Sequence, residues 1–148
     1  MSELDSLYQE LILDHSKRRV GFGLTDELVG VATSHQHNPI CGDDITLRVH
    51  VEGDVVRDVT WEGAGCAISQ ASASMLASLV AEEDGMSRAE ASALVEGFRE
   101  ALRSRGTKPL DEEIFSDAAA LSGVSRYTAR VKCAMLAWVA FEDALARA

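Results

Sequence analysis

The chain has 148 residues and a mass of 15.9 kDa, a size that predicts a single domain with one hydrophobic core. Its net charge of −10 argues against a general nucleic-acid-binding surface, and a hydrophobic content of 47% with only 2 prolines argues against long disordered stretches. The N-terminus shows no secretory signal, and no segment approaches the roughly 18 apolar residues of a membrane span. We therefore expect a cytoplasmic protein that contacts neither nucleic acid nor a membrane.

The first half of the chain is expected to form one helix and three strands. Hydrophobic residues at helical spacing predict an amphipathic helix over 3–16, and weak alternation over 28–32 indicates a first strand. Hydrophobic and polar residues alternate cleanly over 45–51, and the pattern continues over 55–61 after a Glu-Gly-Asp turn. These two segments predict an antiparallel hairpin.

The second half is expected to be helical, because the hydrophobic period changes from two to about 3.6. One helix starts at or just after Cys66, and another starts at the capping box Ser87-Arg88-Ala89-Glu90. Residues 105–109 break that helix, a shorter one follows over 114–121, and Ser125 is expected to cap the last helix. The order of elements predicts an α+β fold with a three-stranded antiparallel sheet and helices packed on one face.

All three cysteines of the chain occur in sequences that suit a metal ligand. Cys41 lies in Asn-Pro-Ile-Cys-Gly-Asp, Cys66 follows Gly-Ala-Gly, and Cys133 follows Arg-Val-Lys. With Asp43 they offer three thiolates and one carboxylate, which fill a tetrahedral shell around Zn²⁺ or hold a small iron–sulfur unit. An odd number of cysteines in a cytoplasmic chain favours this interpretation over disulfides.

The local sequence around two of these cysteines further favours metal binding. Gly42 allows a tight loop that turns Cys41 and Asp43 toward one ion. Cys66 lies where a loop meets a helix, and the positive end of the helix dipole favours a thiolate there. A lone cysteine is more often a buried small hydrophobic residue, so the prediction depends on the motifs in combination.

Cys133 is expected outside the core-facing stripe of the last helix. That stripe is predicted to comprise Val131, Met135, Trp138 and Val139. Arg126 lies within about 20° of Cys133 around the helix and Arg130 about 60° from it, which favours a polar site over a dry interior. Three thiolates and a carboxylate exceed the charge of Zn²⁺ by two, which gives Arg130 an electrostatic role; the simpler alternative is a solvated surface cation.

Other side chains near these motifs have simpler interpretations. Asp43 could be only a turn residue, and Asp44 could replace it as the ligand; Asp43 is preferred because Asp44 begins the strand and should face elsewhere. His35 and His37 are expected to be solvated loop imidazoles rather than ligands. His15 is expected to be a helix-end residue with satisfied hydrogen bonds.

Together, the motifs Asn-Pro-x-Cys-Gly-Asp, Gly-x-Gly-Cys-Ala-x-Ser and Arg-x-x-Cys resemble the IscU/NifU N-terminal superfamily over essentially the whole chain. Within it, the chain is most similar to the SufU branch. Scaffold-type IscU proteins typically carry a His before the last cysteine and a Leu-Pro-Pro-Val-Lys segment upstream, whereas this chain has Lys132 and the different segment 126–130. The resemblance implies one SufU/IscU-like domain over residues 1–148 with a helical insertion at about 84–122. One departure is Lys17-Arg18-Arg19, where the family often has Asn-Pro-Arg.

The resemblance also implies a function. SufU-like proteins bind Zn²⁺ through the residues that match Cys41, Asp43, Cys66 and Cys133 here. They accept sulfur from a pyridoxal-phosphate-dependent cysteine desulfurase during iron–sulfur cluster assembly, and a downstream assembly scaffold is a further expected partner. By this resemblance Cys41 is the sulfur acceptor and Arg130 is the arginine near the zinc.

Attack on a persulfide requires a thiolate, and metal coordination supplies one at neutral pH. Coordination also engages the electron pair of the sulfur in the bond to the metal, which makes the thiolate less reactive. Our hypothesis from the sequence is that a partner side chain, a histidine, replaces Cys41 on the zinc, and that the released sulfur then attacks. Two other functions are compatible with the same residues. One is a scaffold that holds a [2Fe–2S] cluster, which would make the purified protein brown rather than colourless. The other is a structural zinc domain that only docks other proteins, which would unfold without zinc and never form a persulfide.

Overall fold

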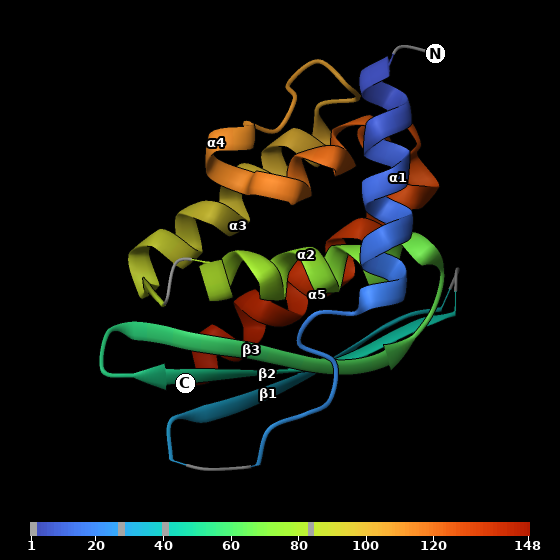
Figure 1. The fold of residues 1–148 in the computed structure, drawn as a ribbon. Coiled ribbons are helices and arrows are strands. Elements are labelled where there is room, and N and C mark those ends of the chain that lie inside the picture. The colour runs from blue at the N-terminus through green and yellow to red at the C-terminus, as the bar shows by residue number, and fades with distance from the viewer. Residues whose placement is uncertain (1–2, 27–28, 40–41, 83–84) are drawn as a thin grey trace.

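An antiparallel sheet forms one layer of the molecule, and helices form a second layer on one of its faces (Figure 1). The structure, a computed structural model, describes residues 3–26, 29–39, 42–82 and 85–148. Within these ranges the strands, which pair in chain order, are β1 (Val31–Asn38), β2 (Asp43–Glu52), β3 (Val55–Ala64) and β4 (Met86–Ser87). The helices are α1 (Glu3–Arg18), α2 (Ala67–Glu82), α3 (Arg88–Arg103), α4 (Glu112–Phe115), the 3₁₀ helix η1 (Ser116–Arg126) and α5 (Thr128–Arg147). None of the helices in these ranges combines the length and apolar character needed to cross a membrane.

The predicted α+β fold is confirmed, and the predicted hairpin corresponds to β2 and β3. In β2, Ile45, Leu47 and Val49 are fully buried and alternate with partly exposed residues, because one face of the strand packs against the helices. The described part of the chain has one strand more than the three expected. This strand, β4, pairs with the start of β3 over two residues, which is too short to leave a pattern in the sequence.

Strand β1 is displaced from its expected position at residues 28–32. It begins at Val31 and pairs with β2 along its whole length. The expected loop position of His35 and His37 was therefore wrong, whereas Leu28 lies outside the described residues. β1 is an edge strand of mostly polar residues, so backbone pairing with β2, rather than a hydrophobic pattern, determines where it runs.

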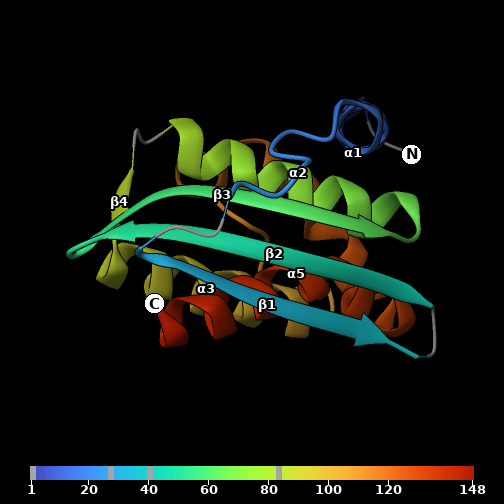
Figure 2. The ribbon, with the colours of Figure 1, turned by 90° about the horizontal axis from the view of Figure 1, so that it is seen from below.

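Helices α2 and α5 cover the sheet, with α2 over β3 and α5 over β1 and β2 (Figure 2). α2 is rich in alanine and serine, and these small side chains allow its neighbours to approach closely. Its buried hydroxyls find partners: Ser72 donates to the carbonyl of Ala134 at 2.6 Å and accepts from the Trp138 indole N–H at 3.0 Å. The Trp138 ring stacks on Phe98, with ring centroids 4.1 Å apart, and so joins α3 to the core.

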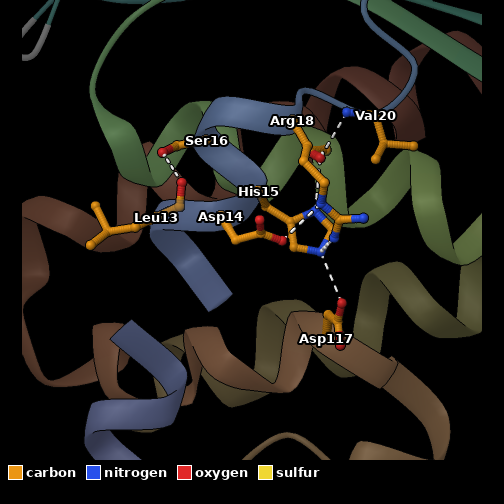
Figure 3. A network of polar contacts seen from close by, with 8 residues as sticks. Leu13, Asp14, His15, Ser16, Arg18, Val20 and Asp117 are labelled. Atoms are coloured by element: carbon orange, nitrogen blue, oxygen red, sulfur yellow. Dashed lines mark hydrogen bonds and ion pairs between the residues drawn. The ribbon is translucent and has the colours of Figure 1, made fainter. Parts of the chain in front are cut away.

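His15, in the last turn of α1, joins that helix to α2 and η1 (Figure 3). Its side chain is fully buried, with Nδ1 at 2.8 Å from the Ser74 hydroxyl and Nε2 at 2.9 Å from a carboxylate oxygen of Asp117. The Val20 N–H also donates to the Ser74 hydroxyl, which fixes the chain as it leaves α1. The expected helix-end histidine with satisfied hydrogen bonds is confirmed.

The predicted helix start is confirmed for α3 and wrong for α5. The hydroxyl of Ser87 accepts from the Glu90 N–H at 3.0 Å and caps α3. The N-cap of α5 is Tyr127 rather than Ser125, because η1 continues past Ser125. The Ser125 hydroxyl is buried and donates to the carbonyl of Ser122.

Candidate metal centre

Three side chains from distant parts of the sequence converge beside the start of β2. Asp43 begins β2, Cys66 directly precedes α2, and Cys133 lies in the second turn of α5. One carboxylate oxygen and the two Sγ atoms lie within 4.8 Å of one another. Cys66 Sγ and Asp43 Oδ2 are 3.7 Å apart, a spacing compatible with ligands about 2.0–2.3 Å from one tetrahedral zinc ion.

Cys41, the fourth residue of the expected ligand set, lies outside the described residues. Gly42 follows it, and the Gly42 N–H donates to the carbonyl of Asn38 at 2.8 Å. Gly42 has φ +74°, a left-handed backbone that favours glycine. Gly42 therefore allows a tight turn directly before Asp43, where β2 begins. The prediction that this turn brings both Cys41 and Asp43 to one ion stays a prediction, because Cys41 lies outside the described residues.

The two consecutive aspartates at the start of β2 point to opposite faces of the sheet. Asp43 is 1% exposed and lies on the helix-covered face with the two cysteines. Asp44 lies on the opposite face, which no helix of the described chain covers, with its carboxylate 2.9 Å from His35 Nε2. Because successive strand residues alternate between faces, Asp44 is not part of the cluster that Asp43 joins.

Gly63, near the end of β3, and Gly65, directly after it, allow this close approach to β2. A Cβ on Gly63 would lie 2.1 Å from the carbonyl oxygen of Asp44, and a Cβ on Gly65 would lie 2.3 Å from Asp43 Oδ1. The Cys66 N–H donates to the same Oδ1 at 2.9 Å. Asp43 is thus held through one oxygen, while the other faces the Cys66 thiol. Sequence reasoning identified the Gly-x-Gly-Cys motif but not this steric requirement.

Cys66 occupies the N-cap position of α2. Its carbonyl accepts from the Gln70 N–H at 3.1 Å, and its thiol is exposed at the positive end of the helix dipole. The buried hydroxyl of Ser69 donates to the same carbonyl at 3.1 Å and lies 3.9 Å from Cys66 Sγ. Ser69 is the serine of the Gly-x-Gly-Cys-Ala-x-Ser motif, and its hydroxyl lies beside the Cys66 thiol.

Cys133 is only 5% exposed, so the expectation that it lies outside the core face of α5 was wrong. Val131, Met135 and Val139, which were assigned to the core stripe, are only partly buried. The buried face of α5 comprises Cys133, Ala134, Leu136, Ala137, Trp138, Ala140, Phe141, Ala144 and Leu145. α5 contacts the sheet, α2 and α3 together, which makes this face wide. Cys133 reaches the cluster from the buried side, and Cys66 reaches it from the exposed side.

The arginines that sequence reasoning placed near Cys133 lie around the start of α5. Arg130 is exposed, and its guanidinium lies 5.7 Å from the centre of the Tyr127 ring, a cation–π contact. Arg126 packs on the turn at Gly106, where an added Cβ would lie 3.0 Å from its side chain. Tyr127, 59% exposed, was not singled out as a site residue, although its position between two arginines was an available signal.

Known proteins resemble this chain along nearly its whole length. The family model described as "NifU-like N terminal domain" matches residues 7–134. The zinc-dependent sulfurtransferase SufU of Bacillus subtilis is 37% identical, covering 99% of this chain and 94% of that protein. The iron–sulfur cluster assembly scaffold protein IscU of Streptococcus pyogenes serotype M1 is 38% identical, covering 99% and 87%. The crystal structure of a nitrogen-fixing NifU-like protein (N-terminal) from Brucella abortus has a TM-score of 0.80 at 28% identity, covering 99% of this chain and 96% of that chain.

Proposed function

This chain belongs to the NifU-like N-terminal domain family, and we propose that it is a zinc-dependent sulfurtransferase that accepts sulfur from a cysteine desulfurase for iron–sulfur cluster assembly. The observation that carries the proposal is the convergence of Asp43, Cys66 and Cys133 within 4.8 Å. The 37% identity to a relative named as a zinc-dependent sulfurtransferase supports it. Further support comes from Lys132, which stands where scaffold-type relatives typically carry a histidine.

The donor set suits zinc. Two thiols and one carboxylate come together, and the thiol of Cys41, two residues before Asp43 in the sequence, is the proposed fourth donor of a closed shell of three sulfurs and one oxygen. Asp43 Oδ1 accepts from the Cys66 N–H, so Oδ2 is the oxygen that can serve as ligand. When bound, zinc keeps the cysteine sulfurs deprotonated at neutral pH.

Cys41 is the sulfur acceptor in this proposal. Its thiolate attacks the outer sulfur of the desulfurase persulfide, a new S–S bond forms at Cys41, and the desulfurase cysteine leaves as a thiolate. No oxidant or reductant is consumed. The exposed guanidinium of Arg130, near the start of α5, offsets part of the negative charge that three thiolates and one carboxylate leave in excess of Zn²⁺.

Mass spectrometry after incubation with a cysteine desulfurase and cysteine tests the proposal. We expect one added sulfur atom on Cys41, removable by a reductant, and none on Cys66 or Cys133. Cys41→Ala should lose both the added sulfur and any stimulation of the desulfurase. Lys17→Ala, which changes an exposed residue of α1 outside the donor set, should keep both. Cys41 without added sulfur while the desulfurase turns over cysteine would overturn the proposal.

A second function, a scaffold that holds an iron–sulfur cluster, is favoured by one observation. Identity to the scaffold protein of S. pyogenes is 38%, as high as identity to the sulfurtransferase. The same four residues could hold a [2Fe–2S] cluster. Metal analysis and the visible spectrum of protein purified without added metal separate the two functions. Stoichiometric zinc in a colourless solution supports sulfur transfer, and a stable brown cluster supports the scaffold.

A further inference from the structure

No helix of the described chain covers the other face of the sheet, called here the open face (Figure 2). Two histidines and an aspartate lie close together on this face. His35 and His37 are two residues apart in β1, so they project from the same face. Asp44 of β2 pairs with His37 in the strand register. Both carboxylate oxygens of Asp44 lie 2.9 Å from His35 Nε2, and Oδ2 lies 3.5 Å from His37 Nδ1. Two imidazoles thus converge on one carboxylate.

Among the described residues only Asp43, Cys66 and Cys133 have three ligand atoms within 4.8 Å of one another, so His35 or His37 must turn before all three side chains on the open face reach one cation. The exposed fractions are 57% for His35, 50% for His37 and 45% for Asp44, so both imidazoles can turn without disturbing the core. Exposed ion pairs contribute little to stability, so the fold does not depend on this arrangement. Imidazole nitrogens and a carboxylate oxygen are a donor set that suits Zn²⁺, Ni²⁺ or Cu²⁺.

We propose that His35, His37 and Asp44 bind a divalent transition-metal cation on the open face of the sheet. This site is separate from the cluster of Asp43, Cys66 and Cys133, because the adjacent carboxylates of Asp43 and Asp44 point to opposite faces. Two neutral imidazoles and one carboxylate leave a bound divalent cation with a net positive charge. Water completes its coordination, so this site binds more weakly than the closed shell of three sulfurs and one oxygen.

Equilibrium dialysis of the full chain, first loaded with one equivalent of zinc and then exposed to Ni²⁺, tests the proposal. We expect one Ni²⁺ per chain in addition to the zinc. The double variant His35→Gln/His37→Gln should bind that Ni²⁺ at least about tenfold more weakly and keep its zinc. Both positions are exposed, and the far-ultraviolet circular dichroism spectrum verifies that the variant is folded. In NMR spectra, Ni²⁺ should broaden the ring signals of His35 and His37 first.

His50→Gln is the matched control. His50 lies on the same face, 3.8 Å from a carboxylate oxygen of Glu52 and 3.5 Å from one of Asp58, but it contributes a single imidazole. This variant should retain the second cation. The proposal is overturned if the wild-type chain binds no Ni²⁺ beyond its zinc, if the double variant binds it undiminished, or if His50→Gln abolishes it. Cys66→Ser should leave Ni²⁺ on the open face, which separates this proposal from the proposed function.

Discussion

Gly65 lies so close to Asp43 that a Cβ on this glycine would be 2.3 Å from the Asp43 Oδ1 atom. The same oxygen accepts a hydrogen bond from the N–H of Cys66, the residue after Gly65. The absence of a side chain at Gly65 and the N–H donor of Cys66 therefore position the Asp43 carboxylate, which faces the two cysteines. Gly65 belongs to the metal centre although it offers no ligand.

Gly65→Ala should displace the Asp43 carboxylate and lower zinc affinity by about 10–100-fold, the usual effect of losing a supporting contact around a metal ligand. Competition with a chromophoric chelator measures this change. Gly123→Ala is the control, since a Cβ at Gly123 would have no atom within 4 Å. Zinc affinity of Gly65→Ala equal to wild type would show that this contact does not position the ligand.

Asp43→Asn and Asp44→Asn should affect the cysteine-bearing site differently. The amide that Asp43→Asn introduces can still accept the Cys66 hydrogen bond but carries no charge, so zinc affinity should fall. Asp44→Asn should leave zinc affinity unchanged, because Asp44 lies on the other face. Removing a carboxylate that is 1% exposed should also raise the melting temperature of zinc-free protein. Chelator competition and thermal unfolding of both forms measure these effects, and equal loss of zinc from both variants would contradict the assignment.

His15→Ala should destabilise the fold by about 2–4 kcal/mol, because it removes a buried side chain and leaves the Ser74 and Asp117 groups without their partner. Urea unfolding gives the free energy. Ser16→Ala, one position along, removes only a hydrogen bond to the carbonyl of Leu13 and should change stability by less than about 0.5 kcal/mol. Similar stabilities for both variants would refute the role of His15 in joining α1 to α2 and η1.

The hydrogen bond of Tyr8 should make the stability of the fold depend on pH in the alkaline range. The Tyr8 hydroxyl donates to Glu112 Oε1 at 2.6 Å, and this bond, with burial and the negative charge of Glu112, raises the pKa of Tyr8 to about 12 from 10.0. The folded state therefore holds the proton more tightly than the unfolded state. The contribution is complete below pH 10 and is lost as pH rises toward 12.

The stability difference between wild type and Tyr8→Phe should accordingly shrink between pH 10 and 12, as denaturant unfolding at several pH values can show. Glu112→Gln should lower the pKa of Tyr8, because it removes the charged acceptor. A stability difference that does not change with pH would contradict the proposed hydrogen bond.

The sequence predicted those strands and helices whose burial on one face produces a periodic pattern of hydrophobic residues. Residues 45–51 and 55–61 alternate because one face of each strand packs on helices, and both became strands. β1 was misplaced because its polar residues lie on an edge strand, where pairing with β2 decides the position. The N-cap at Tyr127 was missed because a 3₁₀ helix runs into α5, and the preceding Ser125 resembles a cap in sequence.

The ligand residues of the metal centre could be predicted, because their residue types and motifs are visible in the sequence. The motifs grouped Asp43, Cys66 and Cys133, but burial of Cys133 depends on how α5 packs, which its helical period does not reveal. The steric role of Gly65 depends on the pairing of β2 with β3. The pairing of His35 with Asp44 likewise depends on the register of β1. Such contacts between distant segments have no local signal in one sequence.

X-ray absorption at the zinc edge tests the central claim, one zinc held by three cysteines and an aspartate, most directly. The His35→Gln/His37→Gln variant with one zinc per chain excludes a contribution from the open face. We predict three sulfur neighbours at about 2.3 Å and one oxygen at about 2.0–2.2 Å. Cys66→Ser should lose one of these sulfurs. A shell of only nitrogen and oxygen, or one that Cys66→Ser leaves unchanged, would contradict the account.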